Sequence, residues 1–230
     1  MLRLLLRGFV ALVATGVVLG CKTVGTMAEY PSEDTLTPGI FLEPEQPVAL
    51  SAGVRVREVY DKGIKMTKNS EGFRSHLYND AARYCTIAYG HLVQKAPCNG
   101  MEPAEFRAGV TEPRGTELLI QDMEIARWSV MTMTRVELTD GQFAALCDFV
   151  YNVGPSNLRN STLLQVINQG DFDRVPAQFR RWIVADGREI PGLKMRRERE
   201  ITLFFDGLPI PRAAARLGEA LSPIDIRTGE

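Results

Sequence analysis

The segment from Ser70 to Val93, SEGFRSHLYNDAARYCTIAYGHLV, constrains the fold of this chain more than any other. An apolar pattern at helical spacing precedes it and Gly72 follows Glu71, which predicts a helix that ends at Glu71. Beyond the glycine, HLYND and YCTIAYG are rich in strand-forming residues, and residues 79–83 between them have turn character. We therefore expect a helix followed at once by a β-hairpin, with side chains of both elements brought together.

Three polar residues in this segment suit acid–base chemistry. Glu71 stands at the expected helix end, Asp80 follows nine residues later in the turn, and Thr86 lies on the second strand. A carboxylate at a helix C-terminus faces partial negative charge, which raises its pKa toward the value a general acid needs. Two carboxyl groups and a hydroxyl suit hydrolysis of a glycosidic bond, where one acid protonates the leaving oxygen and another group handles water or the sugar cation.

These spacings, together with a T-I-x-Y-G-H run, closely resemble the phage-type lysozymes of glycoside hydrolase family 24. Further similarity lies in LTDGQFAALCDFVYNVG, LRNSTLLQVINQGDFD, FRRW and IPGLKMRRERE, so the resemblance covers roughly residues 54–206. Taken singly, Glu71 is more often a solvated helix end, Asp80 a turn former and Thr86 an ordinary strand residue. Ala88 stands where many relatives have glycine, and we expect a slightly different backbone there with activity retained.

The resemblance implies an α+β, mainly helical fold with two lobes, a small β-hairpin lobe and a helical lobe, and a cleft between them. It implies a muramidase that cleaves the β-1,4 bond between N-acetylmuramic acid and N-acetylglucosamine, with Glu71 as general acid and with Asp80 and Thr86 positioning water. An inverting enzyme needs its two carboxyl groups about 6.5–9.5 Å apart, whereas about 5 Å would indicate a covalent route through Asp80. The alternatives are a lytic transglycosylase and a non-catalytic peptidoglycan-binding envelope lipoprotein.

Three residues are expected to contact substrate because they match family positions. Asn152 and Gly154 lie in the YNVG turn that lines the cleft opposite the acids, and an asparagine amide can bond N-acetyl groups and hydroxyls. A simple helix-ending turn is the alternative for both. Arg196, beside Arg197, falls where the family places an arginine near the catalytic acid. If it pairs with Glu71 it would lower the pKa of that acid and oppose the effect of the helix end.

The helical part is expected to contain one long helix over residues 116–133 that links the two lobes, followed by shorter helices. Thr139 and Gln142 have capping-box spacing ahead of the next helix, which the NVGP sequence ends. Further helices are expected over residues 161–168, 171–181 and 191–205.

The N-terminal region has the character of an export signal. Residues 1–21 carry two arginines near their start, at positions 3 and 7, and an uncharged apolar run follows from 8 to 20. This run is shorter than the about 20 residues that are needed to span a bilayer. The VLGC sequence resembles a bacterial lipoprotein cleavage box, so Cys21 is the predicted lipidation site. Ordinary cleavage and a weak signal-anchor, as in some phage endolysins, are the alternatives. The predicted location is the cell envelope or periplasm, with a lipid anchor.

Composition outlines the remaining organisation. Residues 22–53 carry four prolines and five acidic residues against one lysine, which predicts an acidic linker. Residues 207–230 are expected to be a C-terminal tail, a loose appendage apart from one possible short helix. In an oxidising compartment, Cys85 and Cys98 can form a disulfide that braces the strand of Thr86, and close relatives have cysteine at both places. Two free thiols are the alternative. Cys147 is expected to be a buried hydrophobic residue.

A net charge of −1 and a pI of about 6.2 provide no electrostatic argument for binding nucleic acid. Two histidines without a ligand-spaced cluster argue against a metal site, and no glycine-rich phosphate loop is present. We expect no metal or cofactor, a monomer, peptidoglycan glycan strands as the partner, and a membrane contact through Cys21.

Overall fold

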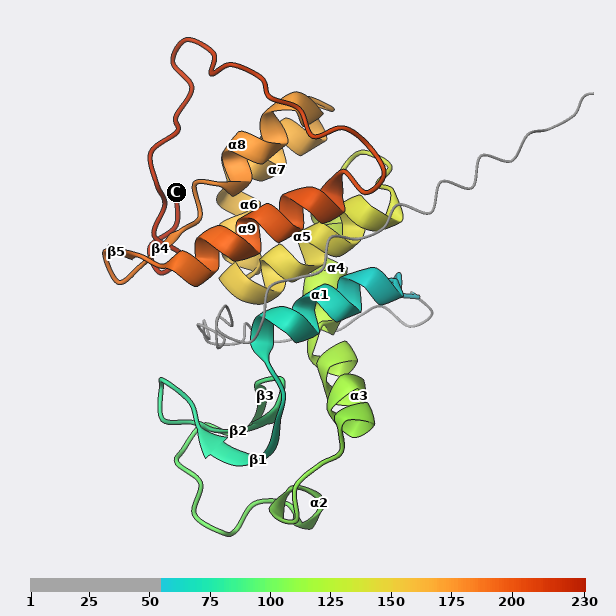
Figure 1. Ribbon diagram of the computed structural model, residues 1–230, viewed down its shortest axis with the longest axis vertical. Helices are drawn as coiled ribbons and strands as arrows, with labels where there is room; N and C mark the ends of the chain where they lie inside the picture. Colours follow the sequence, from blue (N-terminus) through green and yellow to red (C-terminus); the bar gives the residue numbers. More distant parts are fainter. Residues whose placement is uncertain (1–54) are drawn as a thin grey trace, which may run out of the picture.

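Two lobes follow one another along the long axis of the molecule, a small lobe built on a β-sheet and a larger helical lobe (Figure 1). The computed structural model describes residues 55–230. The predicted signal peptide, the predicted lipidation site at Cys21 and the whole of the predicted acidic linker lie outside the described residues. Helices predominate and the sheets are small and antiparallel, so the predicted α+β, mainly helical class is confirmed. Among residues 55–230, no helix is both long and apolar enough to cross a membrane.

Helix α1 (Asp61–Glu71) leads from the helical lobe to the small lobe, as Figure 1 shows. It ends at Glu71 because Gly72 adopts φ +72° while its N–H still donates to the Lys68 carbonyl. The predicted end of this helix is therefore confirmed. The first strand of the small lobe begins three residues later, at Arg74.

The small lobe contains three strands in the order β1–β2–β3, all antiparallel: β1 (Arg74–Asn79), β2 (Cys85–Ala88) and β3 (His91–Gln94). The prediction of two strands is incomplete because Gly90, at φ +89°, reverses the chain and lets the next residues pair with β2. Ala88 adopts φ +57° and is fully buried. This left-handed conformation favours glycine, and in this chain an alanine adopts it.

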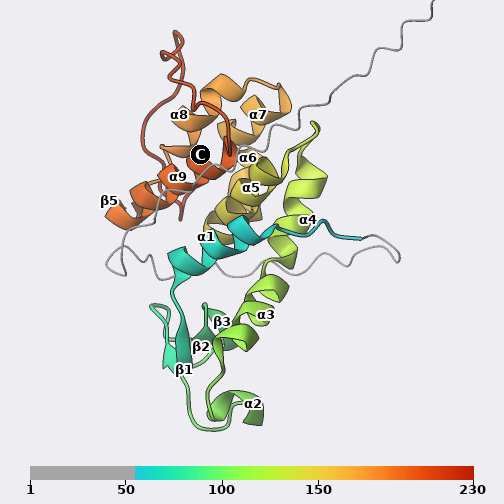
Figure 2. The ribbon, with the colours of Figure 1, turned by 45° about the vertical axis from the view of Figure 1, so that its right-hand side comes forward.

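The long helix expected over residues 116–133 is two helices, α3 (Glu112–Asp122) and α4 (Glu124–Met133). Met123 interrupts it with ψ near zero, at the point where the chain passes between lobes: α3 packs on the small sheet, whereas α4 packs on the helical lobe (Figure 2). The helix also starts earlier than predicted, because the Thr111 hydroxyl caps it by accepting from the Arg114 N–H. Packing on two different partners accounts for a break that no proline or glycine marks.

Helix α5 (Asp140–Val153) is the centre of the helical lobe and is buried along almost its whole length. The Thr139–Gln142 capping box is confirmed, and Gly154 ends the helix at φ +87°. Helices α1 and α9 (Pro191–Phe204) both pack against it. A Cβ added at Gly63 of α1 would lie 2.6 Å from the Ala144 Cβ, so α1 and α5 approach as closely as a glycine permits.

The rest of the helical lobe agrees with the expectations in part. The predicted helix over 161–168 is present as α7 (Thr162–Asn168), and α9 ends within one residue of its predicted end. The helix expected over 171–181 is a short 3-10 turn followed by α8 (Val175–Phe179). Four short elements were not predicted: α2 (Ala104–Arg107), which packs on β1 in the small lobe, and α6 (Pro155–Asn160), β4 (Val184–Ala185) and β5 (Arg188–Glu189) in the helical lobe.

The end of the chain packs against the helical lobe, although residues 207–230 contain no helix. Asp225 forms a parallel bridge with Val184, and Ile224 and Ile226 are buried. The side chain of Glu230 pairs with Arg181. The expectation of a loose appendage is wrong for these last residues, because two apolar side chains in the tail find a place in the core.

Candidate functional site

Glu71 lies where the two lobes meet, as the last residue of α1 and just ahead of β1 (Figures 1 and 2). Only 2% of its side chain is exposed. Its Oε1 accepts a hydrogen bond from Nη1 of Arg196 at 2.6 Å. The helix-ending Gly72 and the packing of α1 on α5 and α9 thus place this carboxyl group against an arginine 125 residues further along the chain.

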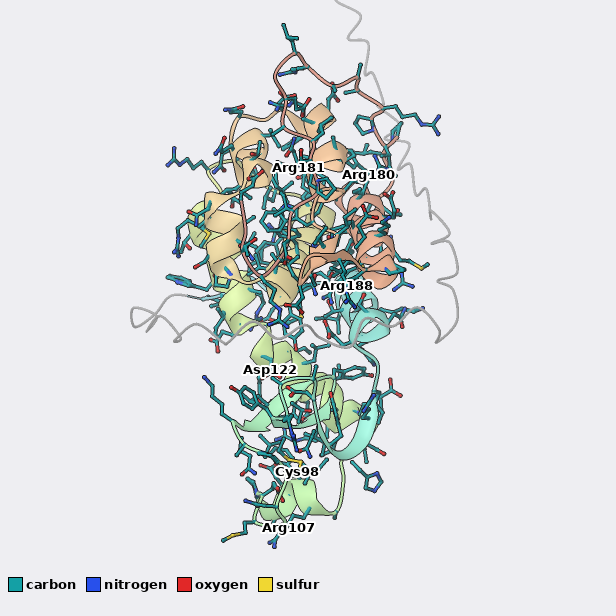
Figure 3. All side chains as sticks on the ribbon, turned by 90° about the vertical axis from the view of Figure 1, so that its left-hand side faces the viewer. Cys98, Arg107, Asp122, Arg180, Arg181 and Arg188 are labelled. Atoms are coloured by element: carbon teal, nitrogen blue, oxygen red, sulfur yellow. A yellow bond between two sulfur atoms is a disulfide. The ribbon has the colours of Figure 1, made fainter. Side chains whose placement is uncertain are left out.

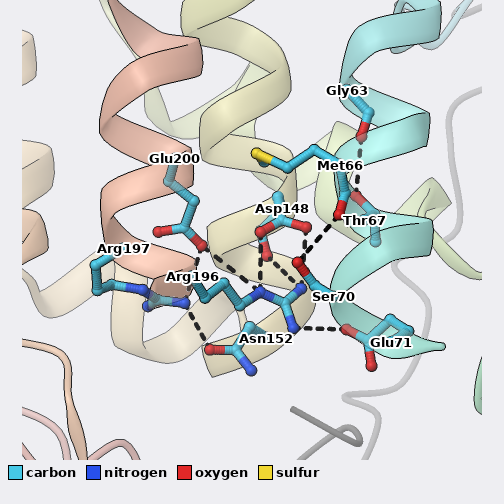
Figure 4. A network of polar contacts seen from close by, with 10 residues as sticks. All are labelled: Gly63, Met66, Thr67, Ser70, Glu71, Asp148, Asn152, Arg196, Arg197 and Glu200. Atoms are coloured by element: carbon cyan, nitrogen blue, oxygen red, sulfur yellow. Dashed lines mark hydrogen bonds and ion pairs between the residues drawn. The ribbon is translucent and has the colours of Figure 1, made fainter. Parts of the chain in front are cut away.

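Arg196 is held by Asp148 on its other side (Figure 4). Its Nε lies 2.9 Å from Oδ2 of Asp148, and its Nη2 lies 3.0 Å from Oδ1, which makes a bidentate pair. Neither side chain has any exposed surface. The guanidinium group of Arg196 is paired with Glu71 and Asp148, and this pairing leaves the expected substrate contact of Arg196 without support in the structure.

Burial is the main cause of the raised pKa of Glu71. The charge and hydrogen bond of Arg196 oppose this effect, and the negative charge of Asp148 adds to it. The predicted direction is confirmed, and its largest cause is desolvation, which the prediction from the sequence did not include. For Asp148, burial also acts to raise the pKa, but the charge and hydrogen bonds of Arg196 outweigh it and the pKa is lowered.

A second buried pair adjoins the first. Nη2 of Arg197 donates to Oδ1 of Asn152 at 2.7 Å and to Oε1 of Glu200 at 2.8 Å (Figure 4). The side-chain nitrogen of Asn152 is buried and has no partner among the described residues. The structure therefore places Asn152 in the same network as Glu71, with an unused amide donor, and Gly154 follows it at the end of α5.

Asp80 and Thr86 both lie near the turn of the β1–β2 hairpin: Asp80 directly follows β1, and Thr86 on β2 pairs with Tyr78 on β1. Oδ1 of Asp80 accepts from the Tyr84 N–H at 2.8 Å, while its Oδ2 is buried without a partner among residues 55–230. Thr86 is fully buried, and its hydroxyl donates to the Tyr78 carbonyl at 3.3 Å. The pKa of Tyr78 is raised chiefly by burial and in smaller part by the negative charges of Glu71 and Asp80, which both lie near its phenol.

Asp148, Tyr78 and Tyr151 were not among the predicted site residues. The pKa of Tyr151 is raised well above its usual value by burial and next by the charge of Glu71, so this phenol also lies near the acid. A signal for Asp148 was present: it is a single charge inside the apolar run FAALCDFV, and a charge on a buried helix face needs a partner. The tyrosines carried no comparable signal.

The Cys85–Cys98 disulfide is confirmed and joins β2 to the loop that follows β3, as the yellow bond beside Cys98 shows (Figure 3). Glu102 lies close enough to both sulfurs to complete a possible set of metal ligands, but the two cysteines are bonded to each other. Cys147 is buried, as predicted.

Nδ1 of His91 on β3 lies 3.0 Å from Asp122, which is placed where the lobes meet (Figure 3). A pocket of about 460 Å³ lies away from all these groups and is lined by Arg180, Ile183, Pro191, Lys194, Met195 and Glu198.

Comparison with known proteins identifies the family to which this chain belongs. A model described as phage lysozyme matches residues 68–200. The endolysin of Bacillus phage B103 is 36% identical over 147 residues, which are 63% of this chain and 53% of that protein, so the chain spans about half the length of this relative. The SAR-endolysin of Bacteriophage PS119 is 34% identical over 66% of this chain and 87% of its own length. The crystal structure of a P22 lysozyme mutant shares 29% identity at a TM-score of 0.57, covering 64% of this chain and 98% of the other. Because the family model covers more than half of the sequence, this chain belongs to the phage lysozyme family.

Proposed function

We propose that this protein is a peptidoglycan hydrolase that cleaves the β-1,4 bond between N-acetylmuramic acid and N-acetylglucosamine, with Glu71 as general acid. The observation that carries this proposal is the environment of Glu71. It is a buried carboxyl group with a raised pKa, it lies at the meeting point of the lobes, and it belongs to the segment that matches the lysozyme family. A carboxylic acid that keeps its proton near neutral pH can protonate a glycosidic oxygen.

Arg196 stabilises the ionised form of this acid, which is the form that Glu71 takes after it has given up its proton. Protonated Glu71 delivers its proton to the leaving oxygen and becomes a carboxylate. Nη1 of Arg196 is already at hydrogen-bond distance from Oε1 and stabilises the new negative charge. Arg196 therefore acts through Glu71 and does not touch the sugar.

Asp80 and Thr86 position the attacking water in this proposal. Oδ1 of Asp80 is held by the turn, which fixes the carboxylate and leaves Oδ2 as a free acceptor for a water proton. The Thr86 hydroxyl lies on the paired strand and can orient the same water from its second lone pair. The carboxyl separation of an inverting enzyme, the cleft between the lobes and the water site itself stay predictions.

Asn152 and Gly154 are the proposed substrate contacts. The unpaired amide nitrogen of Asn152 can donate to an N-acetyl oxygen or a sugar hydroxyl. Its carbonyl oxygen is held by Arg197, which sets the orientation of the amide. Gly154 ends the helix beside it and allows a close approach of backbone to ligand.

The proposed partner is the glycan strand of peptidoglycan, and the proposed location is the cell envelope or periplasm. The relatives called endolysins support an exported protein that acts at the wall. Attachment through a lipid at Cys21 and a monomeric state complete the proposal.

The test is mass spectrometry of the sugar ends that the full-length protein releases from purified peptidoglycan. The expected products have free reducing N-acetylmuramic ends, which Glu71→Gln does not form. Glu117→Gln on the exposed face of α3 is the matched control and keeps the wild-type yield. If the products carry anhydro ends instead, the protein is a lytic transglycosylase and not a hydrolase. If no new sugar ends form, the proposal that the protein is an enzyme is contradicted. In that case binding to sacculi would identify a wall-binding protein.

A further inference from the structure

Two carboxylates share the hydrogen bonds of the Arg196 guanidinium group unequally, and Oε1 of a third, Glu200, lies 3.8 Å from its Nε. Asp148 takes Nε and Nη2 at 2.9 and 3.0 Å, whereas Glu71 takes only Nη1 at 2.6 Å. The three residues come from α5, α9 and α1, and none has more than 2% of its side chain exposed (Figure 4). The bidentate side determines the plane of the guanidinium group and leaves a single N–H directed at Glu71.

This division matters because a buried arginine alone would hold Glu71 ionised. An opposite charge within hydrogen-bond distance favours a carboxylate, and the weak screening inside a protein strengthens that effect. A general acid must instead arrive with its proton. The formal charge of Asp148 offsets that of Arg196, so Glu71 meets a pair that is close to neutral and yet still offers a hydrogen bond.

We propose that Asp148 is a positioning residue for catalysis, which clamps Arg196 and offsets its charge so that Glu71 carries a proton at the pH where glycan is cleaved. This inference rests on the proposed function, because it assigns a purpose to the proton on Glu71. It adds a residue that the comparisons do not assign. The pKa of Asp148 is lowered, mainly because Arg196 outweighs the effect of burial, whereas the pKa of Glu71 is raised, and these opposite directions agree with the proposal.

Each helix or strand that packs against the Glu71–Arg196–Asp148 network contributes further polar or titratable side chains. They are the side chain of Thr67 on α1, the phenol of Tyr78 on β1, the phenol of Tyr151 on α5, and Arg197 and Glu200 on α9. Glu200 is the one that can respond to a change at Asp148. Burial raises the pKa of Glu200 well above its usual value, and the charge of Asp148 contributes to this. If Asp148 becomes neutral, Glu200 ionises more readily and replaces part of the lost negative charge.

The test compares pH–rate profiles of full-length wild type, Asp148→Asn and Asp140→Asn on labelled peptidoglycan. Asp140 lies on the same helix but pairs with Arg57 at the surface, so its substitution makes the same charge change far from Glu71. Asp148→Asn should move the basic limb of the profile about one pH unit lower, with about a tenfold loss of rate above that limb. At lower pH the rate of Asp148→Asn should return to the wild-type value, whereas a variant with a misfolded site would stay inactive at every pH.

The double variant Asp148→Asn/Glu200→Gln should shift the limb further, because Glu200 can no longer ionise in compensation. Asp140→Asn should leave the limb at its wild-type position. A limb that stays in place in both Asp148 variants, while their rates fall equally at every pH, would overturn the proposal.

A measurement on the unmodified protein covers the case in which the variants do not fold. Carbon-13 NMR of the side-chain carboxyl groups, with Glu71→Gln for assignment, follows both acids directly. Glu71 should titrate above the usual glutamate range and Asp148 below the usual aspartate range. A Glu71 that titrates at or below its usual value would overturn the inference. If the wild type releases no sugar ends, the proposed function fails, and this titration still tests the charge relation separately.

Discussion

Thr86 lies inside the β1–β2 ladder with its hydroxyl near the Tyr78 carbonyl, and the side chain is fully buried. Thr86→Val keeps the shape but removes the hydroxyl that the proposed water needs. We expect a loss of about a hundredfold or more in the rate of glycan cleavage. Thr86→Ser retains the hydroxyl and should keep most of the activity. Release of reducing ends measures both, and equal thermal unfolding of the two variants separates chemistry from folding. Full activity in Thr86→Val would remove the residue from the mechanism.

Glu71 should reduce the stability of the folded protein at neutral pH. Burial raises the pKa of Glu71 in the folded protein above its pKa in the unfolded chain. The contribution of Glu71 to the free energy of unfolding is therefore largest at pH values below the unfolded-chain pKa, and it is lost as the pH rises through the folded-state pKa. Glu71→Gln cannot ionise, so it should be more stable than wild type at pH 7 and nearly equal to it at pH 4. Urea unfolding at both pH values measures the difference, with the exposed Glu117→Gln as control. An equal or lower stability of Glu71→Gln at pH 7 would contradict the raised pKa.

At the scale of elements, the contact between α1 and α5 determines where Glu71 lies. An alanine normally stabilises a helix relative to glycine, but a Cβ at Gly63 would meet both the Ala144 Cβ and the Val59 Cγ1 at 2.6 Å. Gly63→Ala should therefore cost about 1–3 kcal/mol in the free energy of unfolding. Adding Ala144→Gly removes one of the clashing atoms and should reduce the coupled part of this cost. Chemical unfolding of wild type, both single variants and the double variant measures this coupling. If the two single effects simply add up in the double variant, the two residues do not clash.

At the scale of the whole molecule, the end of the chain is part of the helical lobe. Ile226 is fully buried, and its carbonyl accepts from the side chain of Asn157 at 2.7 Å. Ile226→Ala should cost about 2–5 kcal/mol in the free energy of unfolding, because it leaves a cavity in the core. Leu217 in the same tail is fully exposed, so Leu217→Ala should change stability by no more than about 0.5 kcal/mol. If the two changes have equal effects in urea unfolding, the tail does not contribute to the core.

Local patterns in the sequence were enough for the elements that local chemistry controls. Gly72 ends α1 at Glu71 because only a residue without Cβ adopts that backbone easily, and the Thr139–Gln142 spacing starts α5 because the two residues cap each other. The resemblance of the Glu71 segment to phage-type lysozymes indicated the family and the overall fold. By contrast, β3 and the break at Met123 depend on which strand or lobe the next residues pack against, and no local signal marks that choice.

Most of the environment of the acid was decided by tertiary structure, although the family resemblance had already suggested an arginine near it, and Arg196 does pair with Glu71. The sequence by itself determined that a carboxyl group stands at the end of a helix beside a hairpin, and it predicted the direction of its pKa for an incomplete reason. The packing of α1, α5 and α9 decided that this group is buried, that Arg196 faces it, and that Asp148 shares the arginine from 48 residues away. Burial and charge pairing are properties of segments that meet in space, so they act on Glu71 only after the chain has brought its distant helices together.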